Sequence, residues 1–202
     1  MERTKNIDKP YLILISGIPN TGKSTTAIKL ASKLGFSTCL GTDEIKALMR
    51  FYDSDFFINQ DSHSCWSHYG NYCNKTFLTG YKKHCQAIGP GIAAIIKQAG
   101  NMGRSVIIEG VHLWPEENYD KNNNFKIFHF IIIQDKPAMW RRNIKQKLDV
   151  YGSKQENVWQ KHQEKYFYVQ EKLKNISNLN KKLILLKNLT PAQNVNKILA
   201  QL

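Results

Sequence analysis

The stretch "YLILISGIPNTGKST" (residues 11–25) decides the fold of this chain. Its first six residues form a short apolar run of the kind that lies buried inside a sheet. The eight residues that follow match the pattern G-x-x-x-x-G-K-[ST], Thr25 adds a second hydroxyl residue, and apolar residues at helical spacing come next. A glycine-rich loop between a buried strand and a helix is the setting in which this pattern binds phosphate. The sequence therefore predicts a phosphate-binding loop, or P-loop.

The chemistry of the loop follows from its residue types. Gly17 and Gly22 let the backbone curl so that successive N–H groups point at phosphate oxygens, and the start of the next helix adds positive potential. Lys23 is expected to reach the β- and γ-phosphates and to act in catalysis, and the Ser24 hydroxyl is expected to coordinate Mg²⁺. We therefore predict that ATP and Mg²⁺ bind here. The expected nucleotide-binding residues are Gly17, Asn20, Thr21, Gly22, Lys23, Ser24 and Thr25.

The rest of the chain alternates strands with helices. Strands are predicted at residues 11–16, 36–40, 105–108, 126–133 and 183–186. Helices are predicted at 22–34, 43–50, 75–98, 137–150 and 155–175, with a last one opened by Thr190-Pro191. Gly35 is placed to end the first helix, and Pro90 is expected to kink or split the third. This alternation favours an α/β fold, one domain over residues 1–202, with a parallel sheet covered by helices on both faces.

The composition is strongly basic, with 29 Lys and Arg residues against 16 Asp and Glu and a formal net charge of +13. Such a charge favours an anionic partner, such as a phosphorylated metabolite, a nucleotide, a nucleic acid or a membrane surface. An AT-rich genome would also enrich Lys and Asn, so the charge alone selects none of them. Because no signal-peptide core and no run of membrane-spanning length occurs, we expect a cytoplasmic protein with free thiols and no membrane partner. Monomer and homodimer are equally compatible with the sequence.

A chain of this size with a P-loop is typical of a kinase. Motors and AAA-type machines need more chain to transmit hydrolysis, and a GTPase should show an N-K-x-D-like sequence that reads guanine. The fourth predicted strand leads instead into "IIIQDKPAMWRRNIK" (residues 131–145), and N-K-x-D occurs nowhere in the chain. The sequence therefore favours transfer of phosphate to a small molecule or a polynucleotide.

A second carboxylate follows the second predicted strand, in "GTDEIKALMR" (residues 41–50). Ligands of open parallel sheets collect at the carboxyl ends of the strands, so Asp43 is placed to accept or orient the proton of an attacking hydroxyl. Lys46 and Arg50 stand three and seven residues further on, on one helix face, where they could bind an anionic acceptor. The alternative is that Thr42 or Asp43 caps the helix while Lys46 and Arg50 are solvated.

Two further segments complete the predicted site. Residues 51–74 lack clear periodicity, and we interpret them as a substrate-side insert or mobile region. Residues 136–155 are interpreted as a lid carrying Arg141 and Arg142, because arginine binds phosphate bidentately and spreads transition-state charge. Adjacent residues cannot share one helix face, so a single arginine of the pair is expected to be catalytic.

Four stretches together resemble the 2-phosphoglycerate kinase family of P-loop kinases. They are "GIPNTGKSTTAIKLASKLGF", "GTDEIKALMR", "GIAAII" (residues 91–96) and "SVIIEGVHLWP" (residues 105–115). The P-loop is common to many kinases, whereas the E-G-V-H-L-x-P string preceded by a threonine-aspartate helix is more specific. The likeness covers residues 11–115 well and leaves the 51–74 segment unmatched.

The resemblance carries expectations of fold, reaction and site. It implies a five-stranded parallel sheet of order 2-3-1-4-5 and transfer of the ATP γ-phosphate to a small anionic, phosphorylated hydroxy acid such as 2-phosphoglycerate. It places Asp43 near the acceptor, Glu109 near Mg²⁺ and His112 in the acceptor pocket. In a P-loop kinase the third strand lies beside the first, so Glu109 would stand at the rim of the site, where it could orient a metal-bound water or hold Lys23 and Ser24 through hydrogen bonds.

Three other functions are compatible with the same motifs. A polynucleotide 5′-hydroxyl kinase would use the same Asp43 and Arg50 geometry, and the net charge favours it slightly, although a nucleic-acid partner also calls for exposed aromatic residues. A toxin-like kinase of sugar nucleotides is the second. The third is a binding module that binds nucleotide without turnover. The small anionic metabolite remains the first expectation.

Overall fold

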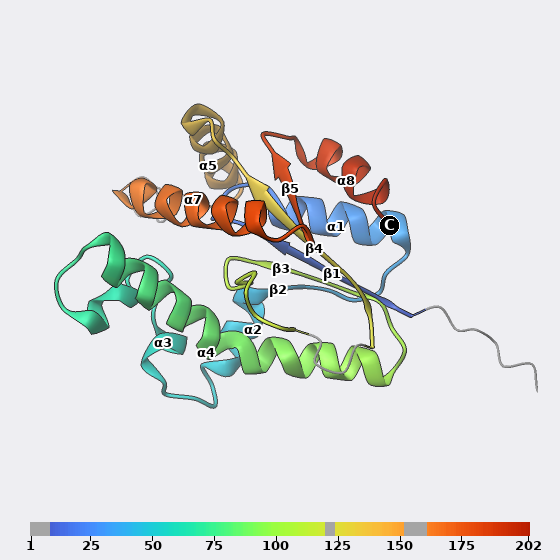
Figure 1. Ribbon diagram of the computed structural model, residues 1–202, viewed down its shortest axis with the longest axis horizontal. Coiled ribbons are helices and arrows are strands. Elements are labelled where there is room, and N and C mark those ends of the chain that lie inside the picture. The colour runs from blue at the N-terminus through green and yellow to red at the C-terminus, as the bar shows by residue number, and fades with distance from the viewer. Residues whose placement is uncertain (1–8, 120–123, 152–160) are drawn as a thin grey trace, which may run out of the picture.

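The computed structural model describes residues 9–119, 124–151 and 161–202 (Figure 1). Its five strands pair in parallel, in the order β2-β3-β1-β4-β5, which confirms the predicted fold class and strand order. The strands are β1 Tyr11–Ser16, β2 Cys39–Gly41, β3 Val106–Gly110, β4 Lys126–Ile133 and β5 Leu183–Lys187. The helices are α1 Lys23–Leu34, α2 Thr42–Met49, α3 Phe56–Asn59, the 3₁₀ helix η1 Cys65–Tyr69, α4 Asn74–Asn101, α5 Pro137–Tyr151, α7 Gln163–Leu179 and α8 Pro191–Leu199.

Helices cover both faces of the sheet, because the strands are apolar on both sides. Ile13 and Ile15 of β1 pack with α1 and α8 on one face, whereas Leu12 and Leu14 pack with α2 and α4 on the other. Figure 1 shows α1 and α8 on one side of the strands and α4 on the other. The second face continues toward β4 and β5, where α5 and α7 pack on it. These layers leave the carboxyl ends of the strands as the open edge.

The central strand β1 delivers the P-loop to the middle of that edge. Ser16, its last residue, lies opposite Gly110 of β3 on one side and Ile131 of β4 on the other. The connection that leaves β1 runs toward β2 on one side of this point, and the connection that leaves β4 runs toward β5 on the other. Open α/β sheets bind their ligands where the connections diverge in this way. Gly35 ends α1 in a left-handed conformation (φ 66°), with its N–H bonded to the Ala31 carbonyl, as the sequence predicts.

Two predicted boundaries are wrong. The strand predicted at 36–40 is the edge strand Cys39–Gly41, because only these three residues pair with β3. Pro90 does not split the long helix, since α4 runs over 28 residues with Pro90 inside it. Ile88 and Ile92, on the turns flanking the proline, are fully buried against the sheet, so tertiary packing keeps the helix continuous.

The 51–74 segment folds against α4. Its α3 and η1 bury Ile58 and Cys65, and a Cβ at Gly80 of α4 would lie 2.6 Å from the Cys65 carbonyl oxygen. Glycine at that position thus permits the close contact. The segment presents residues 61–63 to the cavity described below.

Parts of two sequence predictions fall outside the described residues. They are residues 152–155 of the predicted lid and residues 155–160 of the helix predicted at 155–175. The remaining lid residues belong mainly to α5, and the remainder of that helix belongs to α7. Within the described ranges, none of the helices combines the length and the apolar character needed to cross a bilayer.

Candidate active site

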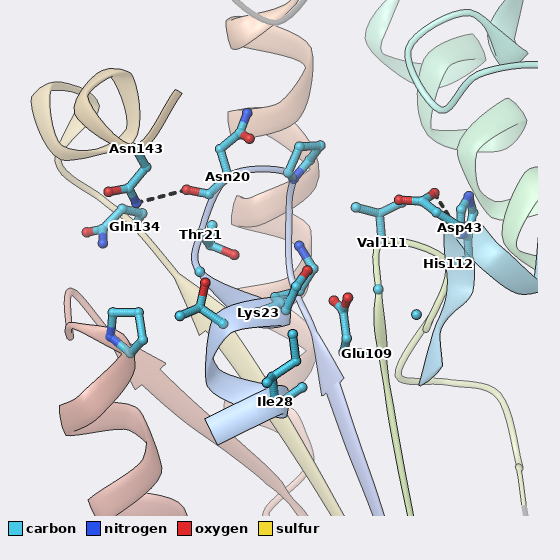
Figure 2. A pocket seen from close by; sticks show the side chains of 18 of the residues that line it. Asn20, Thr21, Lys23, Ile28, Asp43, Glu109, Val111, His112, Gln134 and Asn143 are labelled. Atoms are coloured by element: carbon cyan, nitrogen blue, oxygen red, sulfur yellow. Dashed lines mark hydrogen bonds and ion pairs between the residues drawn. The ribbon is translucent and has the colours of Figure 1, made fainter. Parts of the chain in front are cut away.

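A cavity of about 1320 Å³ opens where the strands end at the P-loop. It is larger than the roughly 300–1,000 Å³ that one drug-sized ligand usually occupies. Its lining comes from the P-loop, from the residues that follow β2, β3, β4 and β5, and from the 51–74 segment, α5 and α7. Figure 2 shows Lys23 and Glu109 in the centre, with Asp43 and His112 on one side and Asn143 and Gln134 on the other. The site can therefore hold two ligands side by side.

The P-loop takes the curled conformation that its glycines predict. Gly22 (φ 87°) and Asn20 (φ 62°) are left-handed, and a Cβ at Gly17 (φ 145°) would collide with the Ile132 carbonyl oxygen. The Lys23 ammonium donates a hydrogen bond of 2.8 Å to the Ile18 carbonyl, which folds it over the loop. Both polar atoms of the Asn20 side chain are buried without a partner among the described residues. Buried amides are normally hydrogen-bonded, so we expect a water molecule or a ligand to bind this one.

Glu109 stands beside the P-loop, as the resemblance implies. Burial raises the pKa of Glu109, and Asp43 and Glu44 add to this, whereas the Lys23 charge and a hydrogen bond from Ser24 oppose it. Within the described residues no three His, Cys, Asp or Glu side chains converge on one point as a metal cage would require. Mg²⁺ needs no such cage, because it takes one or two protein oxygens and completes its shell with phosphate oxygens and water. The Ser24 hydroxyl and the Glu109 carboxylate fit that requirement.

Helix α2 brings Asp43 and Lys46 to the other wall of the cavity. The Asp43 side chain is 77% exposed and lines the cavity, so it is free to meet a ligand. The Lys46 side chain is only 8% exposed, and its ammonium lies 3.6 Å from a carboxylate oxygen of the exposed Asp61. Burial lowers the pKa of Lys46, and Arg50 adds to this, while Asp61 and Asp43 oppose it. The alternative in which Thr42 or Asp43 caps the helix is wrong, because α2 begins at Thr42 and Gly41 occupies the N-cap position.

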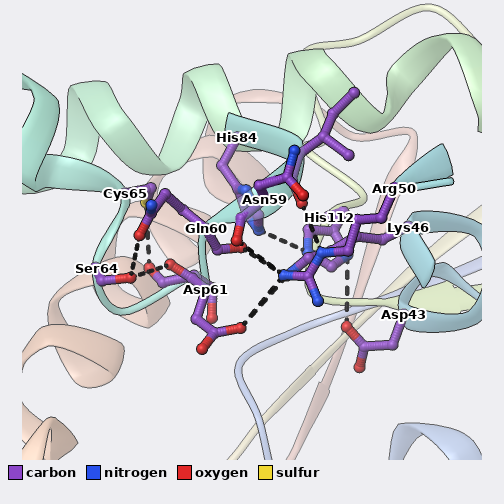
Figure 3. A network of polar contacts seen from close by, with 12 residues as sticks. Asp43, Lys46, Arg50, Asn59, Gln60, Asp61, Ser64, Cys65, His84 and His112 are labelled. Carbon is purple, nitrogen blue, oxygen red and sulfur yellow. Dashed lines mark hydrogen bonds and ion pairs between the residues drawn. The ribbon is translucent and has the colours of Figure 1, made fainter. Parts of the chain in front are cut away.

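Arg50 is placed differently from the sequence expectation. Its guanidinium donates hydrogen bonds of 3.0, 3.1 and 3.3 Å to the carbonyls of Ile58, Asn59 and Gln60. It also lies 3.8 Å from Asp61 (Figure 3). The side chain thus holds the 51–74 segment against α2, whereas we expected it beside the acceptor with Lys46.

The structure separates the two arginines of α5. Arg142 lines the cavity, whereas the Arg141 guanidinium is directed to Gln163 of α7, at 3.5 Å. Side chains of adjacent helical residues diverge by about 100°, which accounts for the difference. Arg142 is the arginine that can meet a phosphate.

Two residues of α5 that the sequence did not mark fasten this helix to the P-loop. The Trp140 indole donates a hydrogen bond of 2.7 Å to the Pro19 carbonyl, and the Asn143 amide donates one of 2.9 Å to the Asn20 carbonyl. Trp140 is fully buried. A tryptophan in an amphipathic helix is expected to pack in the hydrophobic core, so the sequence does not indicate its hydrogen bond with the loop.

His112 is 1% exposed, and both of its ring nitrogens already have partners. Nδ1 lies 2.7 Å from the Thr42 hydroxyl, and Nε2 lies 2.9 Å from Nε2 of His84. His112 therefore has no free ring nitrogen for the expected direct contact with an acceptor. Helix α4 holds the same loop a second time, since the Tyr81 hydroxyl donates a hydrogen bond of 2.6 Å to the Val111 carbonyl. The sequence marked none of Tyr81, Thr42 and His84 as part of this arrangement.

Part of the chain is similar in sequence to curated 2-phosphoglycerate kinases. No protein-family model matches the chain. It is 33% identical over 130 residues to the 2-phosphoglycerate kinase of Methanocaldococcus jannaschii, a match that covers 62% of this chain and 42% of that protein. It is 32% identical over 117 residues to the 2-phosphoglycerate kinase of Pyrococcus furiosus, covering 56% and 39%. The chain thus spans about two fifths of the length of the curated relatives it matches.

Solved structures with the same fold match nearly the whole chain. The shikimate kinase of Bacteroides thetaiotaomicron superposes with a TM-score of 0.52 over 95% of this chain and 99% of its own, at 14% identity. That of Acinetobacter baumannii does so with a TM-score of 0.51 over 96% and 92%, also at 14% identity. A sugar kinase from Janibacter sp. gives 0.53 over 95% and 93%, at 12% identity. The fold is that of the P-loop kinases.

Proposed function

We propose that this chain is an ATP-dependent phosphotransferase that moves the γ-phosphate to a hydroxyl of a small anionic metabolite. The observation that carries the proposal is one cavity with the P-loop and Lys23 in its centre and Asp43 with Lys46 on one wall. A phosphate donor and a hydroxyl acceptor can therefore meet between the two groups that the reaction needs. The names of the sequence relatives support the same reaction class.

The two ends of the cavity differ in chemistry. The β5 end is lined by Met139, Leu189 and Pro191, from the segments that follow β4 and β5, which offer an apolar surface to a nucleoside. The β2 end is lined by Lys46 of α2, which follows β2, and by residues 61–63, which are charged and polar. We assign the first end to the ATP base and the second to the acceptor.

The chain's own residues would divide the reaction among them. Asp43 would accept the proton of the attacking hydroxyl, since its exposed carboxylate faces the space beside the P-loop. Lys23 would leave the Ile18 carbonyl for the β- and γ-phosphate oxygens, and Arg142 would approach from α5. Mg²⁺ bound through Ser24 and Glu109 would neutralise phosphate charge.

Lys46 supports an anionic acceptor. A largely buried ammonium is costly without a strong counter-charge, and the Asp61 carboxylate that pairs with it at 3.6 Å is 64% exposed, so solvent weakens the pair. An anionic group on the acceptor would add to this counter-charge. Among such acceptors we place 2-phosphoglycerate first, because relatives that match 62% and 56% of this chain carry that name.

A polynucleotide 5′-hydroxyl kinase is the second candidate. The aromatic residues that a nucleic acid would stack on are present, since Phe51 and Tyr52 are 85% and 93% exposed. The ammonium of Lys165 also lies 4.9 Å from the Trp66 ring centre and 4.5 Å from that of Tyr72. With a net charge of +13, this surface could attract a polyanion.

One assay distinguishes these acceptors. The purified chain is incubated with γ-labelled ATP and Mg²⁺, and with 2-phosphoglycerate, a 5′-hydroxyl oligonucleotide or a sugar nucleotide. We expect label in 2-phosphoglycerate, and none with Lys23→Met. Labelling of the oligonucleotide or the sugar nucleotide alone would contradict the assignment of 2-phosphoglycerate as the acceptor. ATP binding without transfer to any acceptor would contradict the proposed phosphotransferase activity.

A further inference from the structure

Four consecutive backbone carbonyls of the 51–74 segment, those of residues 57–60, are bound by side chains from two other helices. Arg50 of α2 binds those of residues 58–60, as described above. The carbonyl of Phe57 lies 2.5 Å from Nδ1 of His84, which belongs to α4. Figure 3 shows Arg50, His84 and His112 gathered around this point. Arg50 therefore connects the segment directly to the C-terminal end of α2. His84 and His112 connect it to Thr42, at the start of the same helix.

The proton positions along those histidines follow from the Phe57 carbonyl. A carbonyl oxygen only accepts, so Nδ1 of His84 carries a proton and donates. Burial lowers the pKa of His84 to about 4, so the ring is neutral at pH 7 and its Nε2 is bare. Nε2 of His112, at 2.9 Å, must then be the donor. Burial also holds the pKa of His112 well below its usual value, which leaves its Nδ1 as an acceptor.

The Thr42 hydroxyl therefore donates to Nδ1 of His112, at 2.7 Å. Thr42 is fully buried and begins α2, immediately before Asp43. A Cβ at Gly110 would overlap the Thr42 hydroxyl oxygen, so the side chain is held between Gly110 and the imidazole. The 3.9 Å separation of His112 Nδ1 from an Asp43 oxygen is not an ion pair, because the ring is neutral.

We propose that His84 and His112 are a fixed-tautomer hydrogen-bond relay that couples docking of the 51–74 segment to the orientation of Thr42 and Asp43. His112 is then a positioning residue and not an acceptor ligand. The relay runs Thr42 hydroxyl to His112, His112 to His84, and His84 to the Phe57 carbonyl. Residues 61–63 of that segment line the acceptor end of the cavity. An acceptor that binds there and fixes the segment would therefore also fix the orientation of the proposed base, Asp43, through these hydrogen bonds. The inference rests on the proposed phosphotransferase.

The first arm of the test measures the tautomers. Long-range ¹⁵N–¹H NMR of the ¹⁵N-histidine protein at pH 7 distinguishes protonated from bare ring nitrogens. We expect the Nδ1–H tautomer for His84 and the Nε2–H tautomer for His112, assigned by the loss of each signal in His84→Phe and His112→Phe. The opposite tautomer or a cation at either ring would overturn the relay. This measurement needs no activity, so it stands even if the proposed reaction fails.

The second arm breaks the relay at Thr42 with an isosteric change. Thr42→Val should lower kcat about tenfold, the effect of losing one hydrogen bond of ordinary strength, while KM for ATP stays within about twofold. Thr42→Ser should restore kcat. Ser177→Ala, which removes another buried hydroxyl bond, at 2.8 Å to the Lys174 carbonyl, is the control for lost stability and should leave kcat unchanged. The positioning role of the relay would be contradicted if Thr42→Val raised KM for the acceptor and left kcat unchanged. It would also be contradicted if Thr42→Val and Thr42→Ser had equal effects. Absence of transfer by the wild type would instead overturn the proposed function.

Discussion

The amide of Asn143 donates a hydrogen bond of 2.9 Å to the backbone carbonyl of Asn20, and thereby joins the helix that carries Arg142 to the P-loop. Asn20 is one of the loop's left-handed residues (φ 62°), a conformation that costs free energy for any residue but glycine. The bond from α5 helps to hold that conformation. Loop geometry and arginine position are consequently linked through one side chain.

Removing this link should weaken ATP binding more than it weakens the fold. Asn143→Ala loses one hydrogen bond, worth about 1 kcal/mol, and frees the Asn20 peptide to leave its binding conformation. We expect KM for ATP to rise about fivefold, with KM for the acceptor within about twofold. Initial-rate kinetics and calorimetric titration with ATP check this. Asn196→Ala, at an exposed position of α8, is the control, and equal ATP affinity in both variants would contradict the link.

Adjacent arginines on α5 should differ sharply in kinetics. Arg142→Ala removes the guanidinium that lines the cavity, so kcat should fall at least about a hundredfold, as for loss of a charge that stabilises a transition state. Among the contacts of the described residues, Arg141→Ala removes the one with Gln163, and its kcat should stay within about threefold of the wild type. Both side chains are exposed, so folding should be preserved in each. A larger loss at Arg141 than at Arg142 would reverse the assignment.

The fold was predictable because local signals agree with one another. The P-loop pattern between β1 and α1, Gly35 after α1 and the alternation of strands and helices all indicate the same architecture. The resemblance added the strand order, which propensity alone does not determine. The continuity of α4 across Pro90 was not predictable, because it depends on the burial of Ile88 and Ile92 in the assembled core.

The site was predictable where chemistry follows the chain and not where it depends on distant contacts. Lys23, Ser24 and Asp43 follow strands β1 and β2, so their place at the open edge follows from topology. Arg50 was misplaced, because its partners are carbonyls in a segment without periodicity. The contact of His84 with His112 was not predictable, since it depends on how α4 docks.

Asp43→Asn should abolish transfer without unfolding the protein. Asparagine keeps the size of the side chain but cannot accept the hydroxyl proton, so kcat should fall about 10²- to 10⁴-fold. Because the Asp43 side chain is 77% exposed, the midpoint of thermal unfolding should change little. Glu164→Gln, an exposed carboxylate on α7, is the matched control and should retain full turnover. Near-normal turnover of Asp43→Asn at saturating substrates would exclude this residue as the base.

Stability should fall as the pH drops from about 6.5 toward 4, because of buried histidines. Burial lowers the pKa of His84 and of His129 to about 4, while an unfolded histidine has a pKa of about 6.5. In that window the unfolded chain binds more protons than the folded one, so acid favours unfolding. Each such histidine contributes a slope of about 1.4 kcal/mol per pH unit. The raised pKa of Glu109 acts in the opposite direction, because protonation of that carboxyl favours the folded state.

Urea unfolding at pH 5.0 to 7.0 measures this slope, and His129→Gln tests its origin. His129 bonds only the Ser16 hydroxyl, at 2.9 Å, among the hydrogen bonds of the described residues, and glutamine can replace that contact without titrating. In this variant the pH dependence of the free energy of unfolding should decrease by the contribution of about one proton. Ser177→Ala changes no titrating group and should keep the full pH dependence. A slope that is the same in the wild type and in His129→Gln would show that the folded protein accommodates a charged imidazole at His129.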